Sequence, residues 1–167
     1  MSQENVEIVW AICDAFARGD YEGALKRLDE KAEFVSPPDM IAGGRSWYGR
    51  EGIRQGMTSF MGAWDDYHYE VRNLIDCGDD VLVEGWQRGR GKGSGVEVSE
   101  FIYAVYTVRG GRVIRYRLFR DRGQAHEAAG LTPMPARHES RFAGTAEHWP
   151  PPQNGDRTDV IAEEQTA

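Results

Sequence analysis

The sequence predicts an α+β fold in which helices lie across one face of a long antiparallel sheet. Between residues 67 and 121, apolar and polar residues alternate, and short glycine-containing turns interrupt the alternation three times. Such a period-two pattern is typical of half-buried strands, and turns this short join antiparallel neighbours. The four predicted strands are residues 67–76, 80–90, 96–109 and 112–121.

Helices are predicted before the sheet, because apolar residues there recur three and four positions apart. The first helix covers residues 3–18, and a glycine and an aspartate separate it from a second one over residues 21–26. A short strand, residues 32–35, ends at a pair of prolines. Residues 39–48 form a loop long enough to be a rim or lid, and a third helix follows over residues 49–64.

One domain, residues 1–132, is predicted to contain all of these elements. After the last strand, Asp121 is placed to cap a short helix that Gly130 ends. The remaining residues, 133–167, are rich in proline and charge and poor in aliphatic side chains. Such a segment cannot bury enough surface to offset its ordering entropy, so we expect a disordered proline-rich C-terminal tail.

Charge and composition exclude several classes of function. The net charge of −7 argues against nucleic acid or an anionic membrane as the main partner. The sequence has no apolar run of membrane-spanning length and no signal-peptide pattern at its start, so we expect a cytoplasmic protein. Two cysteines and four scattered histidines form no metal-ligand spacing, and we expect neither metal nor cofactor.

Four short motifs resemble the recurring blocks of SnoaL-like proteins, which belong to the nuclear transport factor two-like superfamily. The motifs are Phe16-Ala-Arg-Gly-Asp20, Tyr48-Gly-Arg-Glu-Gly-Ile53, Gly110-Gly-Arg-Val-Ile114 and Phe119-Arg-Asp121. The resemblance covers residues 4–131 and implies a cystatin-like cone, with helices packed on the concave face of a curved antiparallel sheet. Sheet and helices of such a cone enclose an apolar cavity suited to a small hydrophobic ligand.

The resemblance also implies where catalytic groups would lie. In SnoaL-type aldol cyclases and limonene epoxide hydrolase, the acid lies three residues before the last strand's closing aspartate, which is Leu118 here. The base of steroid isomerase corresponds to Ser36, and its tyrosine on the first helix corresponds to Ile12. None of these three positions holds the family's catalytic group.

If Tyr116 is taken to point inward, the alternation of apolar and polar residues along the strands predicts which residues line the cavity. Leu118 then lies beside Tyr116, and the neighbouring strands contribute Gln87 from one strand and Phe101, Tyr103 and Val105 from another. A shift of one residue would exchange the two faces of a strand. Three tyrosines, Tyr48, Tyr103 and Tyr116, are expected to orient a ligand oxygen. The expected ligand-binding residues are Trp10, Tyr48, Phe60, Trp64, Tyr103, Tyr116 and Leu118.

A buried carboxylate could exchange protons near neutrality, because burial raises its pKa. We take Asp39 as the candidate catalytic acid–base group, since its proline-bounded loop could direct it into the cavity mouth. Glu84 and Glu100 are expected to point outward and to pair with Arg115 and Arg117. If the strand faces were reversed, Glu100 would become the leading acid.

The convex sheet face is expected to be a partner surface. Under the same assumption it carries Trp86, Tyr106 and Phe119 together with two arginines. Because related folds commonly dimerise there, we expect a homodimer.

Two hypotheses about function follow. The first is a SnoaL-like small-molecule-binding protein with isomerase, cyclase or hydrolase activity on an apolar cyclic ligand in the cone cavity. The alternative is a non-catalytic homodimer that binds a ligand or a protein and lacks the family's acid, because Leu118 occupies that position.

Overall fold

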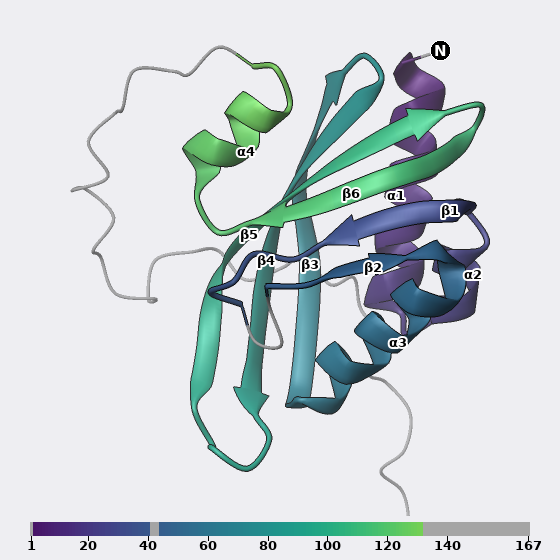
Figure 1. Cartoon of the computed structure of the whole chain (residues 1–167). Helices are drawn as coiled ribbons and strands as arrows, with labels where there is room; N and C mark the ends of the chain where they lie inside the picture. Colours follow the sequence, from purple (N-terminus) through teal and green to yellow (C-terminus); the bar gives the residue numbers. More distant parts are fainter. Residues whose placement is uncertain (1, 41–43, 132–167) are drawn as a thin grey trace, which may run out of the picture. The chain divides into compact units, whose positions relative to one another are not determined.

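A computed structural model describes residues 2–40 and 44–131 and confirms the α+β class (Figure 1). The elements in chain order are α1 (Ser2–Ala17), α2 (Tyr21–Leu25), β1 (Leu28–Val35), β2 (Ser46–Tyr48), α3 (Gly49–Gly62), β3 (Trp64–Cys77), β4 (Asp80–Gly91), β5 (Glu97–Arg109), β6 (Arg112–Phe119) and α4 (Arg122–Ala128). The predicted tail, residues 133–167, and part of the predicted loop, residues 41–43, lie outside the described residues. Within the described part of the chain, no helix is long and apolar enough to cross a membrane.

The strands form one six-stranded sheet in the order β2-β1-β6-β5-β4-β3. The predicted meander of β3 to β6 is antiparallel throughout, whereas β1 pairs with β6 in parallel. Strand β1, predicted as residues 32–35, is longer because it begins at Leu28. Strand β2 was not predicted at all. Both differences depend on pairing between segments far apart in the chain, which no local pattern reports.

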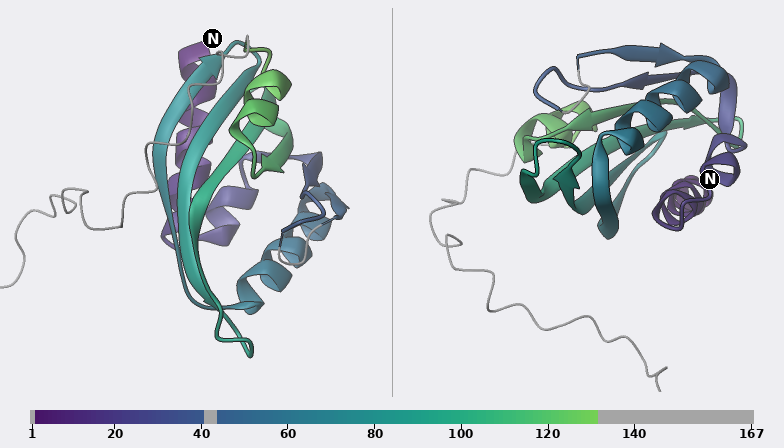
Figure 2. Two further views of the ribbon diagram at one scale, coloured as in Figure 1. Left: turned by 90° about the vertical axis from the view of Figure 1, so that its left-hand side faces the viewer. Right: turned by 90° about the horizontal axis from the view of Figure 1, so that it is seen from below.

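The curved sheet has packed helices on both faces (Figure 2). On the inner, concave face, α1 packs against β3 and α3 packs against β1, and together they bury the larger core cluster. On the outer face, α4 packs against β5 and β6 over a smaller cluster that includes Leu82, Tyr103 and Val105. Asp121 caps α4 as predicted, because its carboxylate accepts a hydrogen bond from the Gln124 N–H at 2.8 Å.

The predicted facing of β5 is wrong. Its register pairs Ala104 with Val83 and Ile102 with Gly85 on β4, and directly opposed residues of an antiparallel pair point to the same face. Ile102, Ala104 and Tyr106 therefore face the concave side, and Phe101, Tyr103 and Val105 face outward. The alternation misleads here because β5 is covered on both faces, so residues 102–106 are all buried.

Four aromatic rings form a stacked row across four strands of the inner face. Trp47 of β2 stacks on Phe34 of β1 with ring centroids 5.0 Å apart. Phe34 stacks in turn on Tyr116 of β6 at 4.3 Å, and Tyr116 stacks on Tyr106 of β5 at 5.3 Å. Each ring is the cross-strand partner of the next. We call these four residues the aromatic row.

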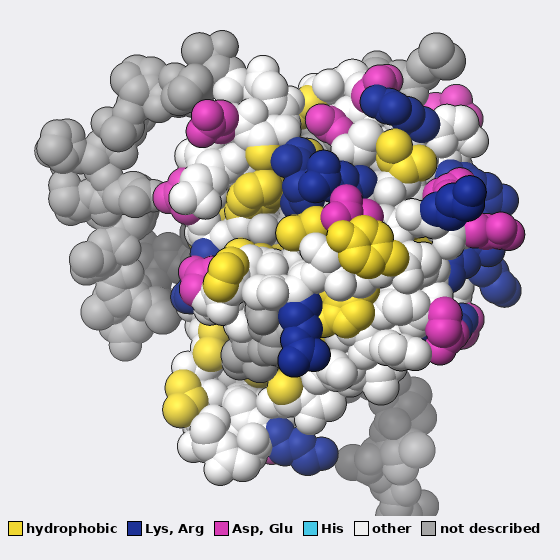
Figure 3. All heavy atoms as spheres, in the orientation of Figure 1, with side chains coloured by type: hydrophobic (Ala, Val, Ile, Leu, Met, Phe, Trp, Pro, Cys, Tyr) yellow, Lys and Arg dark blue, Asp and Glu magenta, His cyan; other side chains and the backbone are white. Residues whose placement is uncertain are grey.

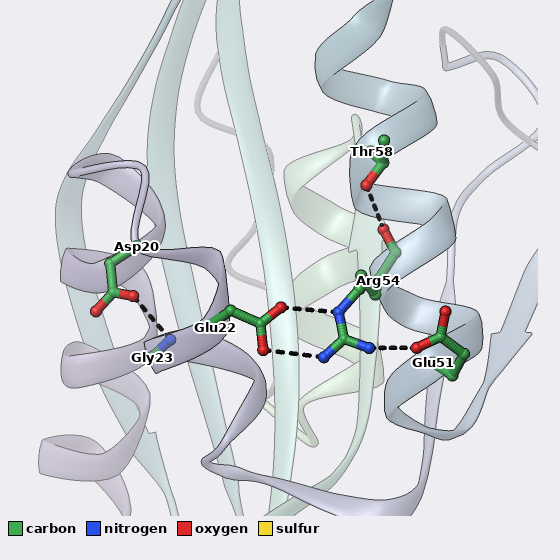
Figure 4. A network of polar contacts seen from close by, with 6 residues as sticks. All are labelled: Asp20, Glu22, Gly23, Glu51, Arg54 and Thr58. Atoms are coloured by element: carbon green, nitrogen blue, oxygen red, sulfur yellow. Dashed lines mark hydrogen bonds and ion pairs between the residues drawn. The ribbon is translucent and has the colours of Figure 1, made fainter.

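An exposed ion pair joins α2 to α3, and a second one lies within α3 (Figure 4). The Arg54 guanidinium on α3 donates to both carboxylate oxygens of Glu22 on α2, at 2.8 and 2.9 Å, and it also pairs with Glu51. This bidentate contact lowers the pKa of the Glu22 carboxyl. Asp20 caps α2 by accepting a hydrogen bond from the Gly23 N–H. The network therefore holds two helices of the inner layer together.

The surface shown in Figure 3 mixes hydrophobic side chains with side chains of both charges. The charged side chains on this face do not gather into one basic patch, in line with the net charge of −7.

A glycine lets α3 approach the aromatic row closely. A Cβ atom added to Gly56 would lie 2.8 Å from ring atoms of Trp47. We expect Gly56→Ala to lower the free energy of unfolding by about 1–3 kcal/mol, because the ring must shift. The measurement is urea unfolding followed by circular dichroism.

Gly62→Ala is the matched control, because a Cβ atom at the last residue of α3 would meet nothing within 4 Å. It should raise stability by up to about 1 kcal/mol through helix propensity alone. Equal effects of the two substitutions would contradict the close contact between α3 and Trp47.

Candidate functional site

The inner face of the sheet and helices α1 to α3 enclose a cavity of about 100 Å³. Its wall is made mostly of aliphatic and aromatic side chains, and the row residues Phe34, Tyr116 and Tyr106 form part of it. Among the described residues that line the cavity, none carries a charged side chain. The cavity can therefore offer hydrogen bonds to a ligand but no counter-charge.

A buried thiol and two phenols form one polar group in the wall. Cys13 on α1 is in hydrogen-bonding contact with Tyr69 on β3 and Tyr106 on β5. Burial raises the pKa of the Cys13 thiol to about 12 and raises the pKa values of both phenols as well. All three groups therefore stay protonated at neutral pH, and Cys13 is not an activated nucleophile.

A second polar group leads from the cavity to its outer edge. The Tyr67 hydroxyl donates to Gln87 Oε1 at 3.0 Å, and Gln87 Nε2 donates to Glu100 Oε1 at 3.0 Å. Arg120 Nη2 donates to Glu100 Oε2 at 2.6 Å, and its guanidinium also pairs with Asp39 at 3.5 Å. Tyr67 and Gln87 line the cavity, while Glu100, Arg120 and Asp39 line a shallow depression beside it. We call Tyr67, Gln87, Glu100 and Arg120 the rim chain.

Three of the predicted ligand-binding residues, Phe60, Tyr116 and Leu118, line the cavity. Trp64 is buried behind the wall, where its ring contacts those of Phe60 and Tyr67. Its indole N–H has no hydrogen-bond partner among the described residues.

The other three lie elsewhere. Trp10 is 50% exposed and Tyr48 is 67% exposed, and neither lines the cavity. Tyr103 points to the outer face beneath α4, because the facing of β5 is the reverse of the predicted one. Of the three tyrosines expected to orient a ligand oxygen, the cavity therefore contains Tyr116 alone.

Asp39 lies in the outer depression with its side chain 61% exposed and paired with Arg120. Its catalytic role stays a prediction. The expected pairing of Glu84 and Glu100 with Arg115 and Arg117 is wrong, because their partners depend on the register and on α4. Glu84 pairs with Arg122 and His126 of α4, Glu100 pairs with Arg120, and Arg115 pairs with Glu33.

The three positions that the sequence motifs singled out, Ile12, Ser36 and Leu118, all line the cavity. Sequence reasoning missed Tyr67, Tyr69 and Tyr106 as lining residues. The spacing of Tyr67 and Tyr69, two residues apart on one strand, was a usable signal, because such residues share a face. Among the described residues, no group of three or more His, Cys, Asp or Glu side chains could hold a metal ion.

Comparison with known proteins supports the predicted fold. The family model described as SnoaL-like domain matches residues 9–116. No curated protein matches the chain. The crystal structure of TerC co-crystallized with polyporic acid is 24% identical, with a TM-score of 0.63, and the match covers 76% of this chain and 98% of TerC.

Two further solved structures have the same architecture. An NTF2-like protein from Burkholderia xenovorans LB400 is 26% identical, with a TM-score of 0.61 and coverage of 76% of this chain and 95% of that chain. A Catenulispora acidiphila protein with a ketosteroid isomerase-like fold, in complex with trimethylamine, is 19% identical, with a TM-score of 0.59 and coverage of 77% and 98%. The cone fold predicted from the sequence motifs is therefore confirmed.

The burial of the Cys13 thiol leads to a testable prediction about its reactivity. With its pKa raised from 9.0 to about 12, Cys13 should react with iodoacetamide at pH 8 about a thousandfold more slowly than an unperturbed thiol. The Cys77→Ser variant isolates Cys13, and mass spectrometry would follow its alkylation in native buffer and in urea.

The Cys13→Ser variant is the control, since it retains the half-buried Cys77. It should be alkylated faster than the Cys77→Ser variant under native conditions. Rapid native labelling of Cys13 would mean that the cavity wall is open at this position.

Proposed function

Because the chain belongs to the SnoaL-like family, we propose that it binds a small, uncharged and mostly apolar molecule in the cavity of its cone. The observation that carries this proposal is the lining itself, which is apolar apart from neutral hydrogen-bonding groups. Transfer of an ionised ligand into such a wall would leave its charge without a partner, at a cost of several kcal/mol or more. An uncharged ligand avoids that cost.

The size of the cavity limits the ligand that fits without rearrangement. A volume of about 100 Å³ is in the range of one small ring, since apolar cavities of roughly 150 Å³ bind benzene. A larger ligand requires side chains to move, and Met40 and Met57 in the wall are the flexible candidates. The TerC structure supports binding of an organic molecule by this fold, because TerC was crystallized with polyporic acid.

A second candidate function is acid–base catalysis of isomerase, cyclase or hydrolase type on an apolar cyclic ligand. The observation that favours it is Glu100, whose carboxylate accepts a hydrogen bond from Gln87 in the cavity wall. Two observations favour the non-catalytic alternative. Both oxygens of Glu100 already accept hydrogen bonds, and Leu118 and Ile12 place no acid or hydroxyl in the cavity.

Filling the cavity tests the binding proposal. Ala104 lines it from β5, and Ala104→Leu would place three more carbon atoms in the free volume. We expect benzene to perturb the NMR signals of cavity residues in the unaltered chain, and Ala104→Leu to weaken that binding by about tenfold or more.

Ala17→Leu adds the same carbon atoms at an exposed position at the end of α1 and should leave benzene binding unchanged. If benzene bound the Ala104→Leu variant as well as the unaltered chain, the cavity would not be the binding site.

We also propose a homodimer through the outer sheet face. The aromatic pair Trp86 and Phe101 supports it, with ring centroids 4.8 Å apart and Phe101 45% exposed. Of the other residues predicted there, Tyr106 faces the cavity instead, and Phe119 packs against the cluster beneath α4. The surface available to a second copy is therefore smaller than predicted.

Sedimentation over a range of concentrations tests this dimer. We expect association that Phe101→Asp weakens, because the new carboxylate would lose its hydration at the interface. Val96→Asp, an exposed apolar position in the turn before β5, is the control. A monomer at high concentration would remove the proposal.

A further inference from the structure

The rim chain fixes the orientation of the Gln87 side-chain amide. Both oxygens of the Glu100 carboxylate accept hydrogen bonds, one from Arg120 and one from Gln87. A carboxylate paired with a guanidinium has no proton to donate, so only the amide nitrogen of Gln87 can face it at 3.0 Å. The amide oxygen of Gln87 must therefore face the other way, toward Tyr67.

The orientation of the Gln87 amide determines the direction in which the Tyr67 hydroxyl proton points. Gln87 Oε1 and the Tyr67 hydroxyl oxygen are 3.0 Å apart, and a contact between two oxygens at that distance requires a proton between them. Only Tyr67 can supply it, because an amide oxygen carries none. Gln87 is 2% exposed, so bulk water cannot replace Tyr67 or Glu100 as its hydrogen-bond partner.

Tyr67 has a single proton, and the rim chain commits it to Gln87. What the Tyr67 hydroxyl retains for a molecule in the cavity is its oxygen lone pairs. We propose that the rim chain makes Tyr67 a hydrogen-bond acceptor, so that a small apolar molecule in the cavity is favoured at Tyr67 when it carries a donor, such as a hydroxyl or ring N–H. This inference rests on the proposed function and narrows the ligand class.

Replacing Glu100 by its amide should reverse the direction of the hydrogen bonds between Glu100, Gln87 and Tyr67 in the rim chain. Arg120 has only donors, so the new side chain of Glu100→Gln must turn its oxygen toward Arg120 and its nitrogen toward Gln87. Gln87 must then present its oxygen to residue 100 and its nitrogen to Tyr67. The Tyr67 hydroxyl accepts that hydrogen bond, and its proton becomes available to the cavity.

Three ring molecules of similar size report on this polarity by NMR titration: pyrrole donates a hydrogen bond, pyridine only accepts one, and benzene does neither. At pH 8, where pyridine is uncharged, we expect the unaltered chain to bind pyrrole about tenfold more tightly than pyridine. Glu100→Gln should invert the preference, and Tyr67→Phe should abolish it. Glu97→Gln, at an exposed glutamate paired with Arg90, should leave the preference unchanged.

The outcomes separate this inference from the proposed function. If benzene binds but pyrrole and pyridine bind equally well, or if Glu100→Gln leaves their ratio unchanged, the inferred polarity is wrong and the binding function stands. If Glu100→Gln does not fold, loss of the pyrrole preference in Tyr67→Phe still tests the role of Tyr67. If none of the three molecules binds, the proposed function fails and the donor preference fails with it.

Discussion

The aromatic row is the interaction on which the rest of this structure depends. Its three stacked pairs join β2, β1, β6 and β5, and each pair adds about 0.5–1.5 kcal/mol beyond the burial of its area. The row requires Phe34 to lie between Trp47 and Tyr116, which places β1 between β2 and β6. The same rings form part of the cavity wall, so one set of contacts holds the sheet together and shapes the site.

Chemistry in the cavity is divided between a neutral interior and a charged edge. Burial keeps the Cys13 thiol and the phenols of Tyr69 and Tyr106 protonated, and the thiol is in contact with both phenols. The ion pair of Glu100 with Arg120 lies in the outer depression, and the Gln87 amide connects it to the interior. Through the amide, a charge outside the cavity can set the direction of hydrogen bonds inside it without being buried there.

Membership in the SnoaL-like family explains the geometry of the cavity better than its chemistry. Ile12, Ser36 and Leu118 all line the cavity, as their places in the sequence motifs imply. Their side chains supply no carboxylate, so an acid–base mechanism would need a carboxylate from another position. Among the described acids, Glu100 is joined to the cavity wall by a hydrogen bond, whereas Asp39 lies in the outer depression with much of its side chain in solvent. A shared fold therefore does not transfer the reaction.

The sequence by itself determined the long strands β3 to β6, the helices α1 and α3, and the cap of α4 at Asp121, because local periodicity and turn residues specify them. Only the tertiary structure decided the facing of β5, the existence of β2 and the partners of Glu84 and Glu100. The inner core covers one face of β5 and α4 covers the other, so its apolar residues show no alternation from which Tyr103 and Tyr106 could be assigned. The other features depend on which distant strands become neighbours, and that is set by packing across the whole sheet.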